Sequence, residues 1–268
     1  MIFRKRPLFS SVKELKYRIS QYKQENGLTK VELLKLILVK SISKLSFGIR
    51  RYRVMFQPRY DFYGWKLRSR LQAEEDLHHE SANRKNLYMQ TQIDFSKVST
   101  FLELGSNSGI QIFELARKFP RCKFVGLDFN LSAVNVANDL AKKSSLGNLS
   151  FYQVDLQELD SLNEYKKVHW DVIFTWATLI YIHPTKILPI IDFGINNSKV
   201  FFMIEQHKKI DFAVKGRLIA GQPTWIRDYV RIIKKLTNKS NQIRVSPIPN
   251  EIWNPGGGHA TQIVVENS

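Results

Sequence analysis

An acid and a short glycine-bearing turn stand together in residues 101–109. The apolar run at 101–104 contains Glu103 and leads directly into Gly105-Ser106-Asn107-Ser108-Gly109. Glycine adopts backbone conformations that other residues avoid, so a ligand can approach the chain closely in such a turn. Where the turn opens a helix, backbone N–H groups point at that ligand. The stretch therefore predicts a cofactor loop, with Glu103 placed to accept hydrogen bonds from a ligand amine.

Two further acids follow, each about one strand–helix unit later. Asp128 lies 25 residues after Glu103, and Asp155 lies one unit beyond Asp128. In open α/β sheets, ligands bind in the crevice outside the carboxyl ends of the strands. A carboxylate at Asp128 can accept both hydroxyls of a ribose there, and Phe129 can lie on the face of an adenine. Three acids in register after a glycine turn predict a nucleoside site.

The turn resembles motif I of the class I S-adenosylmethionine-dependent methyltransferases, written loosely as acid-x-Gly-x-Gly-x-Gly. Glu103, Gly105 and Gly109 match this motif, and Asn107 occupies the middle Gly position. Asn tolerates a positive φ angle better than most residues, so we expect the loop to keep its shape. The dinucleotide motif G-x-G-x-x-G would require glycine where Asn107 and Ile110 stand. The sequence therefore favours S-adenosylmethionine over a dinucleotide.

The resemblance covers about residues 95–268 and implies which side chains contact the cofactor. Asp155 matches the position that accepts the adenine amino group in this family, with Leu156 beside the ring. Residues 171–184 resemble motif IV and its following loop in bacterial small-molecule and glycan methyltransferases. The implied cofactor contacts are Glu103, Gly105, Ser106, Asn107, Gly109, Asp128, Phe129, Asp155, Leu156 and Thr175.

Strand and helix patterns alternate from about residue 99, which is typical of a parallel sheet covered on both faces. Strands are expected at 100–104, 123–128, 149–155, 170–175, 200–205, 242–245 and 261–266, and helices at 110–119, 131–143, 185–193 and from Pro223 to 236. We predict an α/β fold with a Rossmann-like seven-stranded methyltransferase sheet, preceded by a basic helical N-terminal extension. If the last strand is antiparallel beside the fifth, its beginning lies at the cofactor edge.

Methyl transfer from a sulfonium is an in-line displacement, and a hydroxyl nucleophile also needs a base. Histidine suits that task near neutral pH. The candidates, in order of preference, are His207, His183 and His259, each with the alternative of a structural or exposed role. A divalent metal held by Glu205, His207 and His259 is a weaker alternative, and we expect no metal site.

The charged residues are unevenly distributed along the chain. The formal net charge is +17, and residues 1–53 hold 14 Lys or Arg against three Glu, which gives 14 − 3 = +11. Such an excess attracts phosphate-rich partners, including anionic membranes and nucleic acid. We expect three regions: a basic helical N-terminal extension (1–56), a helical lid or connector (57–94) and a class I methyltransferase domain (95–268). The extension either packs on protein, including a second subunit, or lies on an anionic membrane surface. Its uncharged stretches are too short to span a bilayer.

The expected function combines the motifs with this charge. We expect O-methylation of a sugar hydroxyl in a bacterial surface glycan, or in its lipid- or nucleotide-linked precursor. The alternatives are an RNA or natural-product methyltransferase and a non-catalytic scaffold. An Asn/Asp-Pro-Pro-aromatic loop and a Pro-Cys nucleophile are absent, which disfavours nucleic acid. The single cysteine, Cys122, fits a reducing compartment, and no secretory signal is read, so a cytoplasmic location, peripheral on the inner membrane, is expected.

Overall fold

The chain is described by a computed structural model that covers residues 70–77, 81–209, 217–218, 225–238, 240–253 and 259–267. The expected extension (1–56) and the first part of the connector (57–69) lie outside these residues. The expected helix start at Pro223 also lies outside them. The described residues therefore include the sheet, its covering helices and the carboxyl edge of the sheet.

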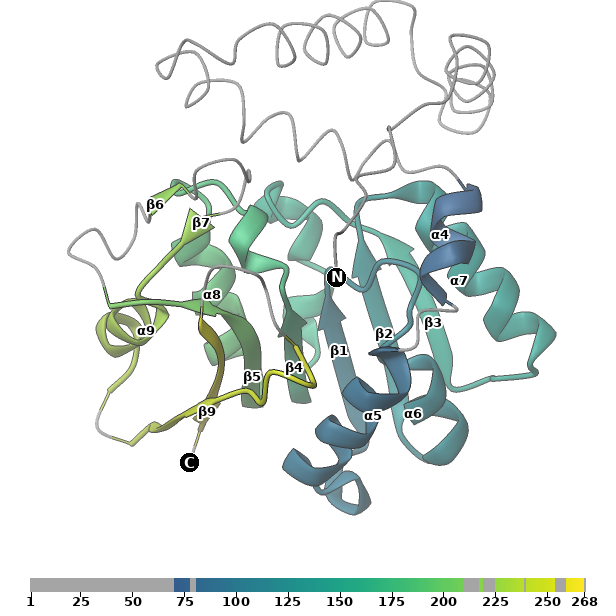
Figure 1. Ribbon diagram of the computed structural model, residues 1–268, viewed down its shortest axis with the longest axis horizontal. Helices are drawn as coiled ribbons and strands as arrows, with labels where there is room; N and C mark the ends of the chain where they lie inside the picture. Colours follow the sequence, from purple (N-terminus) through teal and green to yellow (C-terminus); the bar gives the residue numbers. More distant parts are fainter. Residues whose placement is uncertain are drawn as a thin grey trace, which may run out of the picture.

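Seven strands form one sheet in the order β3-β2-β1-β4-β5-β9-β8 (Figure 1). The strands are β1 (Thr100–Leu104), β2 (Lys123–Asp128), β3 (Leu149–Gln153), β4 (Trp170–Trp176), β5 (Ser198–His207), β8 (Gln242–Pro247) and β9 (His259–Glu266), with a separate pair β6 (Arg217–Leu218) and β7 (Trp225–Ile226). Strands β1 to β5 pair in parallel, whereas β9 is antiparallel to both β5 and β8. The predicted seven-stranded sheet is confirmed, and β9 beside β5 has the antiparallel direction that was considered as a condition.

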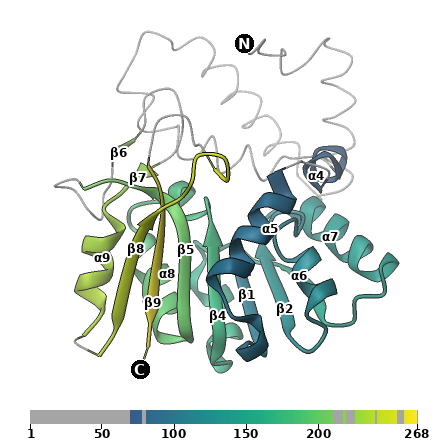
Figure 2. The same ribbon diagram turned by 60° about the horizontal axis from the view of Figure 1, so that its bottom comes forward.

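Helices cover both faces of the sheet (Figures 1 and 2). They are α4 (Arg70–Leu77), α5 (Ser81–Gln92), α6 (Phe113–Lys118), α7 (Leu131–Lys143), α8 (Ile187–Asn196) and α9 (Tyr229–Leu236). Within the described ranges, none of these helices is long and apolar enough to cross a membrane. Apolar residues of α5, α6 and α7 share one core cluster, and those of α8 and α9 share the other.

The alternation of side chains in β1 assigns each residue to one of these faces. Phe101 packs in the cluster of α5 to α7, whereas Leu102 and Leu104 pack in the cluster of α8 and α9. Successive side chains of a strand point to opposite faces. Glu103 therefore lies on the face that α5 covers, at the carboxyl edge of the sheet.

Two predicted boundaries next to the glycine turn were wrong. The helix begins at Phe113 and not at 110, because the N–H groups of Ile112 and Phe113 both donate to the carbonyl of Gly109, at 3.1 and 3.0 Å, and form a turn first. Strand β3 ends at Gln153, so Asp155 lies two residues beyond it. The local turn at Asp155 does not follow from the strand pattern.

The predicted helix start near Pro223 was also wrong. Residues 225–226 form β7, which pairs with β6, and α9 begins only at Tyr229. The helix is capped by Asp228, whose carboxylate accepts a hydrogen bond from the N–H of Arg231 at 2.9 Å. The Asp228 cap is a stronger helix-start signal than Pro, since its side chain satisfies a free N–H group.

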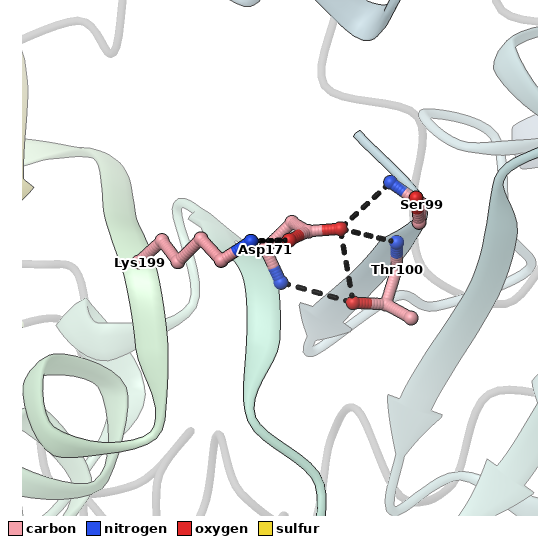
Figure 3. Close-up of polar contacts among 4 residues, drawn as sticks. All are labelled: Ser99, Thr100, Asp171 and Lys199. Atoms are coloured by element: carbon pink, nitrogen blue, oxygen red, sulfur yellow. Dashed lines mark hydrogen bonds and ion pairs between the residues drawn. The ribbon is translucent and has the colours of Figure 1, made fainter. Parts of the chain in front are cut away.

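Asp171 ties the beginnings of β1, β4 and β5 together (Figure 3). Its Oδ2 accepts hydrogen bonds from the N–H groups of Ser99 and Thr100, at 2.7 and 3.0 Å. Its Oδ1 pairs with Nζ of Lys199 at 2.7 Å. Burial acts to raise the pKa of Asp171, but the ion pair and the backbone hydrogen bonds outweigh it, and the pKa is lowered.

We expect Asp171→Ala to lower the free energy of unfolding by about 1–2 kcal/mol at neutral pH, because two backbone N–H groups lose their acceptor. Since the folded pKa is lowered, this contribution is present above the unfolded pKa and is lost as pH falls through the folded pKa. Urea denaturation from neutral to acidic pH measures both effects. Asp160→Ala, at an exposed position, is the control, and an equal loss in the two variants would contradict the prediction.

Candidate functional site

The loop from Gly105 to Gly109, called the glycine loop below, has the backbone that its sequence predicts. Gly105, Asn107 and Gly109 have φ angles of 76°, 50° and 81°, so the expected positive φ of Asn107 is confirmed. A Cβ atom on Gly109 would lie 2.3 Å from Cζ of Phe151. The N–H groups of Gly105 and Ser106 donate to the carbonyl of Leu127 at 2.7 and 2.9 Å, which fixes the loop to β2.

Asp128, the last residue of β2, holds the glycine loop from the other side. Its Oδ2 accepts a hydrogen bond from the N–H of Asn107 at 2.8 Å, and its Oδ1 accepts one from the N–H of Asn130 at 2.9 Å. Asn130 caps α7 through the N–H of Ala133, at 3.2 Å. One carboxylate thus joins the end of β2, the glycine loop and the start of α7. A carboxylate oxygen can accept more than one hydrogen bond.

Glu103 is a buried acid with an unsatisfied oxygen. Its side chain is 1% exposed, and its Oε2 has no hydrogen-bond partner among the described residues. Burial raises the pKa of Glu103 well above its ordinary value, the Asp128 carboxylate adds to this rise, and Lys85 acts against it. Leaving a buried acceptor unsatisfied is unfavourable by about 1–3 kcal/mol. A ligand cation at this point would remove that penalty.

Other unsatisfied polar atoms surround the same edge. In the part of the chain that the structure describes, four more buried side-chain atoms next to the glycine loop have no partner: Asn86 Oδ1, Ser106 Oγ, Ser108 Oγ and Trp176 Nε1. They come from α5, the glycine loop and the end of β4. Buried polar groups in proteins are nearly always hydrogen-bonded. A polar ligand bound over the glycine loop explains this cluster.

These residues fit S-adenosylmethionine. The orphaned oxygen of Glu103 suits its ammonium group, and Lys85 on α5 suits its carboxylate. Asp128 suits the ribose hydroxyls, because its carboxylate lies beside the glycine loop at the end of β2. The glycine loop brings backbone close to the ligand without a Cβ atom in the way.

The remaining predicted cofactor contacts occupy several positions. Asp155 is half-buried, and its Oδ1 accepts a hydrogen bond from the N–H of Gln157 at 2.9 Å. The N–H group of its neighbour Val154 donates to the carbonyl of Asp128 at 2.8 Å, so Asp155 lies beside the end of β2. Phe129 is half-buried beside Asp128, and Leu156 is buried in the cluster of α8 and α9. Thr175 is fully buried, and its hydroxyl donates to Oε1 of Glu205 at 2.7 Å.

The structure brings two of the three candidate histidines together. His207 and His259 are register partners in β5 and β9, at the same edge as the glycine loop. His183 is exposed in the segment after β4, where its Nδ1 lies 2.8 Å from Oγ1 of Thr185. Among the described residues, no group of three His, Cys, Asp or Glu side chains could hold a metal ion.

Aromatic side chains lie beside this edge. The rings of Trp176 and Trp253 are 6.3 Å apart at 60°, and Nζ of Lys85 lies 5.0 Å from the centre of the Trp176 ring. The hydroxyl of Tyr88 donates to Oε1 of Gln262 at 2.8 Å and so joins α5 to β9. Trp176 is buried in the cluster of α5 to α7, and Trp253 packs against that cluster. Trp176 ends β4, the strand that pairs with β1 just before the glycine loop.

Sequence reasoning missed Lys85, Trp176 and Arg227. For Lys85 the available signal was its place on the helix before the glycine loop, in the region expected to be a lid or connector. Trp176 ends a predicted strand and could have been found by extending that strand by one residue. Arg227 donates to the carbonyls of Leu179 and Ile182. It carries no local signal, since these partners lie far from it in the sequence.

Comparison with known proteins identifies the family. A family model described as a methyltransferase domain matches residues 95–243. No curated protein matches the chain. The fold is similar to that of the apo form of the S-adenosylmethionine-dependent methyltransferase SibL, with a TM-score of 0.51 and 15% identity over 69% of this chain and 55% of SibL. The match thus spans about half the length of SibL.

Two further structures are similar. The O-methyltransferase of a trans-AT PKS multienzyme of Brevibacillus brevis, in complex with S-adenosyl-L-homocysteine, has a TM-score of 0.53 and 13% identity over 83% of this chain and 81% of that chain. The N-terminal domain of EvdMO1, in the presence of SAH and D-fucose, has a TM-score of 0.51 and 14% identity over 71% of this chain and 84% of that chain. At such identities the likeness shows the fold alone. The family match covers more than half of the chain, so the chain belongs to the methyltransferase domain family.

Proposed function

We propose that the protein O-methylates a sugar hydroxyl of a bacterial surface glycan or of its lipid- or nucleotide-linked precursor. The observation that carries this proposal is the contact of Trp176 with Trp253 and Lys85 at the end of β4, the strand beside β1. A sugar offers apolar C–H faces to aromatic rings and hydroxyls to polar side chains, and binding pockets combine both kinds of group. The form Leu-Gly-Ser-Asn-Ser-Gly of motif I resembles that of surface-polysaccharide methyltransferases. The similarity to the EvdMO1 domain, whose structure was determined in the presence of D-fucose, is consistent with a sugar acceptor.

The proposed contacts fall on three parts of the cofactor: its amino-acid group, its ribose and its adenine. Glu103 accepts hydrogen bonds from its ammonium group, and Lys85 pairs with its carboxylate. Asp128 accepts the two ribose hydroxyls. Asp155 accepts the adenine amino group, with Phe129 and Leu156 against the ring. The backbone of the glycine loop, with Ser106 and Asn107, completes the contacts. Thr175 contributes indirectly, through the hydrogen bond that its hydroxyl donates to Glu205.

The proposed reaction is an in-line displacement at the methyl carbon. Bound S-adenosylmethionine supplies a methyl group on a positively charged sulfur, and the C–S bond breaks as the O–C bond forms, with its electron pair going to sulfur. The acceptor hydroxyl gives its proton to a base, for which His207 is the first candidate, before His183 and His259. His207 is the register partner of His259 at the carboxyl edge of the sheet, and this position supports His207 as the first candidate. No metal is part of the proposed mechanism.

Replacement of Lys85 tests the amino-acid part of the cofactor site. We expect Lys85→Met to weaken the binding of S-adenosylhomocysteine by about tenfold, since a charge-assisted hydrogen bond is worth about 1.5–3 kcal/mol and the site is partly open to water. Binding of 5′-methylthioadenosine, which lacks the amino-acid group, should not change. Calorimetry with both ligands measures this difference, and Lys85→Arg is the matched control. Equal weakening for both ligands would contradict the assignment.

The acceptor is tested with labelled S-adenosylmethionine and three acceptor pools: nucleotide-linked sugars, lipid-linked glycans and RNA. We expect label in one of the sugar pools. Label that appears only in RNA would overturn the glycan proposal. Calorimetry with S-adenosylhomocysteine separates an enzyme from a non-catalytic scaffold, because no binding at millimolar ligand would favour the scaffold.

A natural-product acceptor is the second candidate. It is favoured by the similarity to the O-methyltransferase of a polyketide multienzyme. Against a cysteine-dependent nucleic-acid chemistry, Cys122 is buried, and burial raises the pKa of its thiol to about 12, with the Asp171 carboxylate adding to the rise. A small-molecule acceptor library in the same label assay distinguishes this candidate from a glycan.

The basic extension is proposed to place the enzyme near its acceptor. Residues 1–56 form this extension in our proposal, residues 57–94 a connector and residues 95–268 the catalytic domain. The charge of +11 in residues 1–53 supports binding to an anionic inner-membrane surface, and packing on a second subunit is the alternative. Truncation of residues 1–53 should move the protein from the membrane fraction to the soluble fraction, and no shift would remove the membrane role.

A further inference from the structure

The segment after β4 is held at its beginning by a buried acid. This segment, residues 177–183, is called the β4 loop, and it contains the single 3-10 turn η4 (Leu179–Tyr181). Oε1 of Glu205, on β5, accepts hydrogen bonds from the N–H groups of Thr178 and Leu179 at 3.1 and 3.0 Å. The same oxygen accepts the hydroxyl of Thr175 at 2.7 Å. One oxygen of a residue with no exposed surface therefore satisfies the free N–H groups at the start of the turn.

The end of the same turn is held by a buried base. Arg227 lies between β7 and α9, and like Glu205 it has no exposed surface. Its Nη1 donates to the carbonyl of Leu179 at 2.8 Å, and its Nη2 donates to the carbonyl of Ile182. Its backbone is fixed beside the end of β5 by a bridge to His207 and by a hydrogen bond from Lys208 N–H at 3.0 Å.

The two side chains match the polarity of the turn. A carboxyl group lies at the N–H end and a guanidinium at the carbonyl end, which is the favourable arrangement for a helical turn. Burying an ionisable group is unfavourable unless its hydrogen bonds are supplied. Two such groups, Glu205 and Arg227, direct their hydrogen bonds at one short loop. The free-energy cost of burying both groups is consistent with a functional role for the position of the β4 loop.

Thr178 connects the β4 loop to the glycine loop. Its Oγ1 lies 3.5 Å from the carbonyl oxygen of Gly105. A Cβ atom on Gly105 would lie 2.3 Å from that Oγ1 and 2.4 Å from Cγ2 of Thr178. The side chain of Thr178 thus fills the space that a side chain on Gly105 would need. A shift of the β4 loop would remove the support of Gly105, whose positive φ angle of 76° shapes the glycine loop.

We propose that Glu205 and Arg227 are positioning residues for cofactor binding. They hold the β4 loop so that Thr178 packs on Gly105 and keeps the glycine loop in its binding conformation. The effect on the ligand rests on the proposed binding of S-adenosylmethionine at the glycine loop. The effect on the β4 loop itself does not, and the two are measured separately.

The experiment compares Glu205→Ala with Glu205→Gln in the full chain. Glutamine keeps the acceptor oxygen that holds Thr178 and Leu179, whereas alanine removes it. Hydrogen exchange of the amides of the β4 loop reports on the hold, with the amides of β2 as an internal reference. Calorimetry with S-adenosylhomocysteine reports on the cofactor site.

We expect Glu205→Ala to speed exchange in the β4 loop but not in β2, and to weaken S-adenosylhomocysteine binding by about tenfold. Glu205→Gln should retain slow exchange and an affinity within about threefold of the unaltered protein. Arg227→Met should speed exchange near Ile182. Unchanged exchange in the Glu205→Ala loop, or unchanged affinity when exchange is faster, would overturn the proposal.

A second variant covers the case in which Glu205→Ala does not fold. Thr178→Ala removes only the side chain that packs on Gly105 and leaves the backbone hydrogen bonds to Glu205. It should weaken S-adenosylhomocysteine binding with unchanged exchange at Leu179, and unaltered binding would overturn the last step. If the unaltered protein itself binds no S-adenosylhomocysteine, the proposed function fails, whereas the exchange results still decide whether Glu205 holds the β4 loop.

Discussion

Asp128→Ala is expected to weaken the binding of S-adenosylhomocysteine by about tenfold or more, where a factor of ten is about 1.4 kcal/mol. Two effects add. The proposed acceptor of the ribose hydroxyls is lost, and hydrogen bonds to a charged acceptor are worth about 1.5–3 kcal/mol each. The N–H groups of Asn107 and Asn130 also lose the carboxylate that holds them, at 2.8 and 2.9 Å. Calorimetry gives the change in affinity directly.

A ligand without the 2′-hydroxyl separates these two effects. If Asp128 accepts that hydroxyl, the 2′-deoxy analogue of S-adenosylhomocysteine binds the unaltered protein more weakly, and the Asp128→Ala variant no longer distinguishes the two ligands. Glu158→Ala, at an exposed position beyond β3, is the matched control and should bind both ligands as the unaltered protein does. An unchanged affinity in Asp128→Ala would show that the ribose assignment is wrong.

The sheet and the glycine loop could be predicted because their signals are local. Glu103, Gly105 and Gly109 lie within seven residues, and the φ angle that Asn107 adopts is a property of that residue type. The antiparallel position of β9 beside β5 entered only as a condition, because the order of strands in a sheet is not a local signal. Local spacing therefore predicts the donor end of the site.

The contacts that hold the site together could not be predicted, since they join distant parts of the chain. Glu205 meets Thr178 across 27 residues, and Arg227 meets Leu179 across 48. The sequence offered Glu205 as a ligand of an alternative metal site, whereas its side chain is fully buried and holds the β4 loop. The hydroxyl of Thr175 also donates to Glu205, 30 residues away, and the predicted contact of Thr175 with the cofactor stays a prediction. Side-chain partners of this kind follow from packing, which no sequence period reports.

The protonation of Glu205 should make the stability of the whole domain depend on pH. Burial raises the pKa of Glu205 to about 7, although hydrogen bonds from Thr175, Leu179 and Thr178 act to lower it. Two other titratable groups lie close to it: Arg227 and Tyr229. Between its ordinary pKa near 4.5 and its folded value, the folded protein holds a proton that the unfolded chain has released. Stability from this group is therefore full below the unfolded pKa and is lost as pH rises through the folded pKa.

Glu205→Gln should remove this dependence, because glutamine keeps the acceptor oxygen and carries no proton to release. A difference of about 2.5 pKa units corresponds to about 3 kcal/mol, so the variant should gain about that much unfolding free energy relative to the unaltered protein between about pH 4.5 and pH 8. Urea denaturation at several pH values measures the difference, and unchanged m-values show that the unfolding reaction is the same. Glu164→Gln, at an exposed position, should show no such trend. Parallel pH profiles for Glu205→Gln and the unaltered protein would mean that Glu205 is ionised throughout this range, with Arg227 as its buried counterion.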